Sequence, residues 1–120
     1  MADRMVIKLT HAGDDPERAL VGLNVAAAAL ATGMTVSIFL AFDGVRLATP
    51  DYVDDLEIDA SPPGRELLDT VIDGGVKLTV CGPCATRRGL VEADFIEGTV
   101  VAGSAAFVAE IAAGAVPLVY

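Results

Sequence analysis

The stretch Thr35-Val36-Ser37-Ile38-Phe39-Leu40-Ala41-Phe42 decides the fold, because it is almost entirely apolar and rich in β-branched and aromatic residues. A half-exposed strand would alternate polar and apolar residues, so this run predicts a strand that is buried on both faces. Such strands occur in parallel sheets that are covered by helices. The stretch therefore predicts an α/β protein.

Strand and helix patterns alternate on both sides of this run. On its amino-terminal side we expect a strand from Met5 to Thr10 and an alanine-rich helix from Pro16 to Thr32, capped by Asp15 and ended by a left-handed Gly33. On its carboxyl-terminal side the patterns predict a helix over Arg65–Ile72, strands over Val76–Val80 and Thr99–Ala102, a helix from a Ser104 cap to Ala113, and a strand over Val116–Tyr120. This order favours a three-layer α/β/α sandwich around a five-stranded, mainly parallel sheet.

The segment from Asp43 to Gly64 follows neither pattern. It contains turn-forming residues and an acidic run from Asp51 to Asp59. We interpret it as a mobile insert with a solvated acidic loop, and a lid or partner-docking surface is the second interpretation.

Composition limits the functions that the protein can have. The 120 residues suffice for one domain, which we expect to cover residues 1–120. The net charge of −9 repels phosphate backbones and anionic lipids, so we expect neither nucleic acid nor membrane as a partner. The start of the chain enters the first strand without the pattern of an export signal, which predicts a cytoplasmic protein. The first helix carries almost no charge from Ala19 to Ala31 and has more apolar surface than one sheet face requires, which predicts an oligomer.

The only two cysteines, Cys81 and Cys84, lie where the third strand is expected to become a helix. Unpaired N–H groups at a helix start, together with the charges of Arg87 and Arg88, favour a thiolate over a thiol. We therefore predict that Cys81 is ionised near neutral pH. A small buried residue is the plain alternative for Cys81. For Cys84 the alternatives are helix packing, a resolving thiol or a metal ligand.

Other candidate site residues surround this cysteine turn. Gly82 lies between the cysteines, and either arginine is a candidate for binding an anion, although both are also suited to surface pairs with Glu92 or Asp94. His11 follows the first strand and is a candidate base or proton carrier near Cys81, with a plain surface residue as the alternative. The sequence has no phosphate-binding glycine loop and no flavin signature, so we expect no cofactor.

The chain resembles the DsrE/DsrF-like family over nearly its whole length. The features similar to that family are the first strand and alanine-rich helix, the run from Val36 to Val45, and the strand that ends in Cys81 and is followed by Arg87-Arg88-Gly89. The resemblance implies a three-layer α/β fold, assembly into trimers or hexamers, and sulfane sulfur carried as a persulfide on Cys81 between proteins. Cys84 departs from the sulfur-relay pattern.

Three functions follow from these residues and remain open. The first is a sulfur carrier or sulfurtransferase that uses Cys81 and exchanges sulfur with a protein or a small sulfur compound. The second is a thiol–disulfide redox protein in which Cys81 attacks and Cys84 resolves. The third is a non-enzymatic oligomer that binds a small ligand, or a soft metal between Cys-x-x-Cys pairs of several chains, since one pair alone has too few ligands for a metal site.

Overall fold

A computed structural model of the protein describes residues 3–120. Its sheet has the order β4-β3-β2-β1-β5. The strands are β1 (Arg4–Leu9), β2 (Thr35–Leu40), β3 (Lys77–Cys81), β4 (Val100–Ala102) and β5 (Val116–Val119). All four strand pairings are parallel, which confirms the predicted α/β class.

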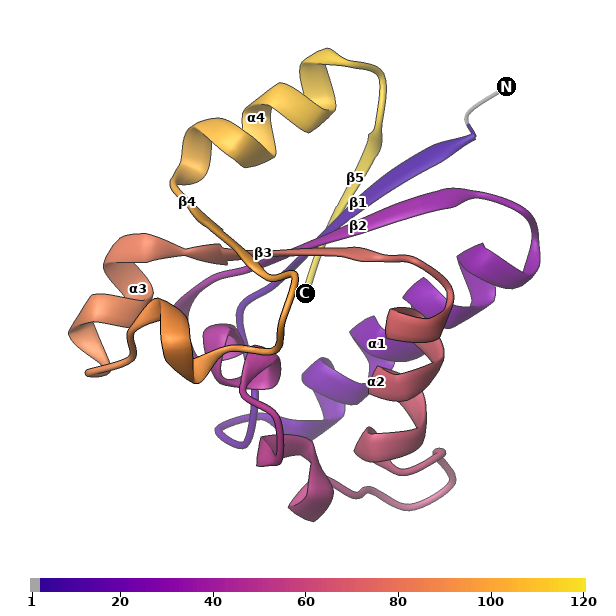
Figure 1. Ribbon diagram of the computed structural model, residues 1–120. Coiled ribbons are helices and arrows are strands. Elements are labelled where there is room, and N and C mark those ends of the chain that lie inside the picture. The colour runs from indigo at the N-terminus through magenta and orange to yellow at the C-terminus, as the bar shows by residue number, and fades with distance from the viewer. Residues whose placement is uncertain (1–2) are drawn as a thin grey trace.

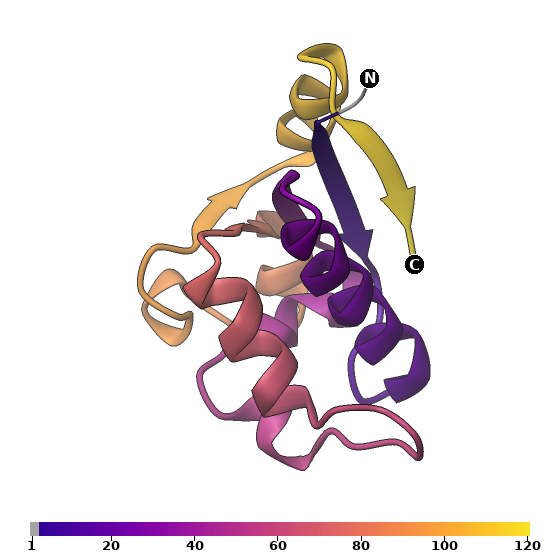
Figure 2. The same ribbon diagram turned by 90° about the vertical axis from the view of Figure 1, so that its right-hand side faces the viewer.

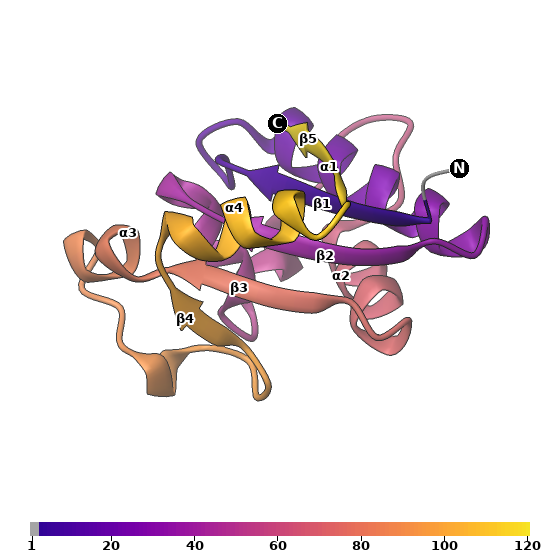
Figure 3. The same ribbon diagram turned by 90° about the horizontal axis from the view of Figure 1, so that it is seen from above.

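The helices form a layer on each face of the sheet. Helices α1 (Pro16–Ala31) and α2 (Gly64–Asp73) pack against each other on one face, and α4 (Ser104–Ala112) crosses the other face (Figure 1). Figure 2 shows α1 and α2 side by side, with α4 well apart from both. The short helix α3 (Gly82–Arg87) projects beyond the end of β3, away from the other helices (Figure 3). The predicted three-layer sandwich is therefore confirmed.

Strand β2 shows why the apolar run specifies this architecture. Neighbouring residues of a strand point to opposite faces, so Ile38 and Leu40 enter the core under α1 and α2 while Phe39 points towards α4. The ring of Phe39 lies 5.6 Å from that of Phe107 on α4. Ile38 and Leu40 are fully buried, and the run is apolar because both of its faces are covered.

The prediction for the segment after β2 is wrong in two respects. The strand ends at Leu40, and Phe42 adopts a positive φ of 51° at the start of the 3₁₀ helix η1 (Phe42–Ala48). The segment is also no insert outside the core, because η1 and a second 3₁₀ helix, η2 (Tyr52–Asp55), bury Val45, Leu47 and Val53. The apolar residues of these two short helices thus belong to the hydrophobic core.

The helix ends confirm two predicted caps and correct a third. Asp15 accepts a hydrogen bond from the backbone N–H of Arg18 at 3.2 Å, and Gly33 has a φ of 90°. Ser104 is not the cap of α4: Gly103 occupies that position, and no side-chain hydrogen bond caps the helix. Met1 and Ala2, which entered the argument against an export signal, lie outside the described residues. Within residues 3–120, no helix is both long and apolar enough to cross a bilayer.

Candidate functional site

The candidate site lies at the edge of the sheet where β1, β2 and β3 end. The parallel register places Leu9, Leu40 and Val80 in one row, so the segments that follow these three strands emerge at the same edge. These segments are the turn after β1, the helix η1 and the cysteine turn. At this edge η1 packs against α3.

Cys81 is both the last residue of β3 and the residue that precedes the first turn of α3. Pro83 lies within the first two positions of α3, where a missing N–H group costs no helical hydrogen bond. Gly82 is half-buried, and a Cβ atom there would make only an ordinary contact, at 3.5 Å, with Val101. Gly82 therefore lies close to β4, but the space there would also accommodate an alanine.

The two thiols are buried and differ in their electrostatic surroundings. Cys81 is 8% exposed and Cys84 is 4% exposed. Burial raises the pKa of Cys81 above its ordinary value of 9.0, and the hydrogen bond that it shares with the Cys84 thiol raises it further. The opposing charge of Arg87 is a smaller effect. The prediction that Cys81 is the ionised thiol is therefore wrong, because burial outweighs the charges and α3 is only six residues long.

Cys84 is the thiol that ionises first. Burial alone would raise its pKa, but the Cys81 thiol and the backbone N–H of Phe42 donate hydrogen bonds to its sulfur. The charges of Arg87 and Arg88 add to these effects, so the pKa of Cys84 is lowered overall. Of the two thiols, Cys84 is therefore the stronger acid, and Cys81 keeps its proton to higher pH.

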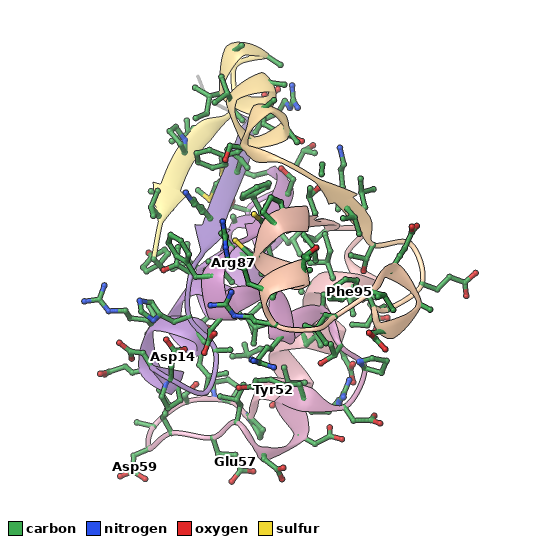
Figure 4. All side chains as sticks on the ribbon, turned by 90° about the vertical axis from the view of Figure 1, so that its left-hand side faces the viewer. Asp14, Tyr52, Glu57, Asp59, Arg87 and Phe95 are labelled. Atoms are coloured by element: carbon green, nitrogen blue, oxygen red, sulfur yellow. The ribbon has the colours of Figure 1, made fainter. Side chains whose placement is uncertain are left out.

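The two arginines have different roles. Arg88 binds Asp43 through Nε at 2.6 Å and donates from Nη1 to the carbonyl oxygen of Cys84 at 3.1 Å. Neither Glu92 nor Asp94 is its partner, contrary to the surface-pair alternative, and Asp94 instead accepts a hydrogen bond from the N–H of Val91. Arg87 is exposed at the side of α3 (Figure 4), and its charge acts on both thiols.

His11 is not brought into contact with the cysteines. It follows β1, and β2 lies between β1 and the strand that carries Cys81. Its Nδ1 lies 2.9 Å from a carboxylate oxygen of Asp14. Burial acts against ionisation of Asp14, but the N–H of Ala12 and the His11 ring outweigh it and lower the pKa of that carboxyl. The backbone N–H of Gly13, the residue before Asp14, donates a hydrogen bond to the hydroxyl of Tyr52 at 2.9 Å.

Sequence reasoning missed two residues of this site. Phe42 was assigned to a strand, whereas its backbone contacts the Cys84 sulfur and its ring lies 5.9 Å from Nζ of Lys8. Asp43 was taken for a turn former, and it holds Arg88 instead. One signal could have indicated the role of Asp43. It directly follows the predicted strand Thr35–Phe42, and the carboxyl ends of parallel strands lie at the same edge of the sheet, where the cysteine turn also lies.

No metal site is formed by the described part of the chain. Among residues 3–120, no three or more histidine, cysteine, aspartate or glutamate side chains are grouped so that they could hold an ion. Both cysteines are free thiols. A metal bound by this cysteine pair would need ligands from further chains.

The protein is therefore a small α/β protein with a parallel sheet. Its cysteine site lies at the carboxyl end of the third strand. The chain belongs to the DsrE/DsrF-like family, whose profile matches residues 3–117. It is 39% identical over 104 residues to the uncharacterized protein MK0008 of Methanopyrus kandleri, covering 83% of this chain and 79% of that protein. It is 38% identical over 99 residues to the uncharacterized protein MJ0989 of Methanocaldococcus jannaschii, covering 82% and 83%.

Two solved structures share the fold. The YchN protein from E. coli superposes with a TM-score of 0.77 at 15% identity, covering 98% of this chain and 99% of YchN. Protein MTH1491 of unknown function from Methanobacterium thermoautotrophicum superposes with a TM-score of 0.74 at 19% identity, covering 98% of each chain. At these identities the likeness establishes the fold alone.

Proposed function

We propose that the protein carries sulfane sulfur as a persulfide on Cys81 and delivers it to an acceptor thiol. One observation carries the proposal: Cys81 and Cys84 are buried thiols within hydrogen-bonding reach of each other at the end of β3, and the lowered pKa of Cys84 suits it to take up the proton that Cys81 gives up. Membership of the DsrE/DsrF-like family supports sulfur chemistry at this position. Cys81 is the more exposed of the two thiols, which favours it as the carrier.

The pair supplies both a nucleophile and a place for its proton. As the Cys81 sulfur attacks the outer sulfur of a donor hydropersulfide, R–S–SH, its proton passes to the Cys84 thiolate. The new bond joins Cys81 to the outer sulfur, the S–S bond of the donor breaks, and R–S⁻ leaves with the electron pair. In delivery, the acceptor thiolate attacks the outer sulfur, and the departing Cys81 sulfur recovers its proton from Cys84.

A redox function is the second candidate, because the two thiols are within hydrogen-bonding reach of each other. After Cys84 has given its proton to the solvent, its thiolate can attack the Cys81 sulfur of the persulfide, forming a Cys81–Cys84 disulfide and releasing HS⁻. That reaction would make the protein a persulfide reductase that needs an external thiol to restore the dithiol. The carrier function instead requires the persulfide to outlast this attack.

Anaerobic intact-mass spectrometry after treatment with a hydropersulfide tests the proposal. The wild type is expected to gain one sulfur atom, mapped by peptide analysis to Cys81. Cys84→Ser should still gain it, more slowly, whereas Cys81→Ser should not. Loading on Cys84 alone, or no loading in the wild type, would refute persulfide carriage on Cys81. Rapid formation of the disulfide with release of sulfide would select the redox function.

We also propose that the chain, as a single domain over residues 1–120, works as a homotrimer or homohexamer in the cytoplasm and exchanges sulfur with a partner protein or a small sulfur compound. The reducing cytoplasm would keep both cysteines free. Helix α4 supports assembly, because none of its residues is buried and it exposes Val108 and Ile111. On α1, the helix from which the sequence predicted an oligomer, Val21 is exposed by 41%.

A further inference from the structure

The basic side chains of the protein fall into two groups, those that form ion pairs and those that do not. Five of the eight form ion pairs with carboxylates: Arg4, Arg18, Arg65, Lys77 and Arg88. Lys8, Arg46 and Arg87 have no carboxylate partner among residues 3–120. These three belong to the end of β1, to η1 and to α3, which all meet at the edge that holds the cysteines. In a chain of net charge −9, the positive charges that no carboxylate neutralises thus belong to segments that meet at this edge.

Lys8 is the most constrained of the three. Its side chain is half-buried on the α4 face of the sheet, and its ammonium lies 5.6 Å from the centre of the Phe107 ring and 5.9 Å from that of the Phe42 ring. Aromatic faces attract a cation without neutralising its charge. The two rings therefore hold the ammonium in place and leave its hydrogen-bond donors available.

The register connects Lys8 to the thiols. Lys8, Phe39 and Thr79 form one row across β1, β2 and β3, and Cys81 is the next residue of β3 on the same face. Phe42 completes the connection, because its ring contacts Lys8 while its backbone N–H contacts the Cys84 sulfur. Phe42 is 55% exposed, so solvent reaches the residue that joins the ammonium to the cysteine turn.

We propose that Lys8, assisted by Arg87, binds the anionic group of a small sulfur donor and thereby makes the protein selective for hydropersulfides that carry a carboxylate. This inference rests on the proposed sulfur carriage and adds the class of donor. The carboxylate binds the ammonium beside Phe42 and directs the terminal sulfur of the donor towards the cysteine pair. The transfer is the one described above: Cys81 gains the outer sulfur, Cys84 gains the proton, and the thiolate of the carboxylated donor leaves.

Three short hydropersulfides that differ in charge test the proposal: those of mercaptopropionate, mercaptoethanol and cysteamine. Initial rates of sulfur loading on the full chain should give the lowest KM for the anion and the highest for the cation. Lys8→Met keeps the apolar stem and should raise the KM for the anion about five-fold, as expected for loss of one close charge pair, and should raise the KM for mercaptoethanol persulfide much less. Lys8→Arg should keep the preference.

Lys77→Met is the matched control. It also removes one positive charge from this face of the sheet. Lys77, however, begins β3, at the end of the strand far from Cys81, and it pairs with Glu110. It should leave the order of the three donors intact. Equal KM values for the three donors in the wild type, or equal effects of Lys8→Met and Lys77→Met, would overturn the anion site while leaving sulfur carriage in place. Failure of every donor to load the wild type would instead refute the proposed function itself.

Discussion

Arg88 binds Asp43 across 45 positions of sequence, with Nε donating to Oδ1 at 2.6 Å. The pair joins α3 to η1, the two short helices on either side of the Cys84 sulfur, and the same guanidinium also holds the carbonyl oxygen of Cys84. Both side chains are partly shielded from water, with 22% and 31% of their surface exposed. This contact therefore sets how α3 sits against the backbone N–H of Phe42.

Removing this ion pair should loosen the cysteine turn. We expect Arg88→Ala and Asp43→Ala each to lower the free energy of unfolding by about 1 kcal/mol, and the double variant to lose less than the sum. Urea denaturation of the four proteins measures this coupling. Arg87→Ala is the control, because Arg87 has no carboxylate partner among residues 3–120, and its loss should change stability little. Strict additivity of the two alanine variants would show that the pair does not act as a unit.

The second prediction concerns the order in which the thiols ionise. Cys84→Ala should leave a thiol whose pKa lies above 9.0, because burial of Cys81 remains. Cys81→Ala should raise the pKa of Cys84 relative to the wild type, because Cys84 loses a hydrogen-bond donor. Ultraviolet absorbance of the thiolate measures both values, with urea-unfolded protein as the reference. A thiol that ionises below 9.0 in Cys84→Ala would contradict this order.

The same shifts give a pH dependence of stability. The pKa of Cys84 is lower in the folded than in the unfolded protein, so its contribution is present above 9.0 and is lost as the pH falls through the folded value. The raised pKa of Cys81 contributes in the opposite sense: its effect is present below 9.0 and is lost as the pH rises through its folded value. Between the folded pKa of Cys84 and 9.0, the wild type should therefore gain stability relative to Cys84→Ala as the pH rises.

The fold was predictable because its signals are local. The apolar run of β2, the cap at Asp15 and the left-handed Gly33 each depend on residues close in sequence. The state of the thiols was not predictable in the same way. It depends on how deeply Cys81 is buried and on the N–H of Phe42, a residue far away in the chain, and neither can be read from the spacing of the cysteines. Tertiary contacts outweighed the local charges.

Phe42 provides the third prediction, because a bulky residue rarely adopts a positive φ. Phe42→Ala and Phe42→Gly both remove the ring, but only glycine adopts this φ without strain. Phe42→Gly should therefore be more stable than Phe42→Ala by about 1 kcal/mol. Midpoints of urea unfolding compare the two variants, which serve as controls for each other. A more stable alanine variant would mean that the backbone is not left-handed at this position.

The fourth prediction separates the two surfaces that are candidates for assembly. Val108 on α4 is 60% exposed and Val21 on α1 is 41% exposed, on opposite faces of the sheet. If α4 lies in the subunit interface, Val108→Asp places a carboxylate among apolar contacts and should shift the protein towards monomers in analytical ultracentrifugation. Val21→Asp introduces the same charge into a helix of the other layer and should leave the assembly intact. Dissociation by Val21→Asp alone would move the interface to α1, as the sequence first indicated, and a monomeric wild type would exclude both surfaces.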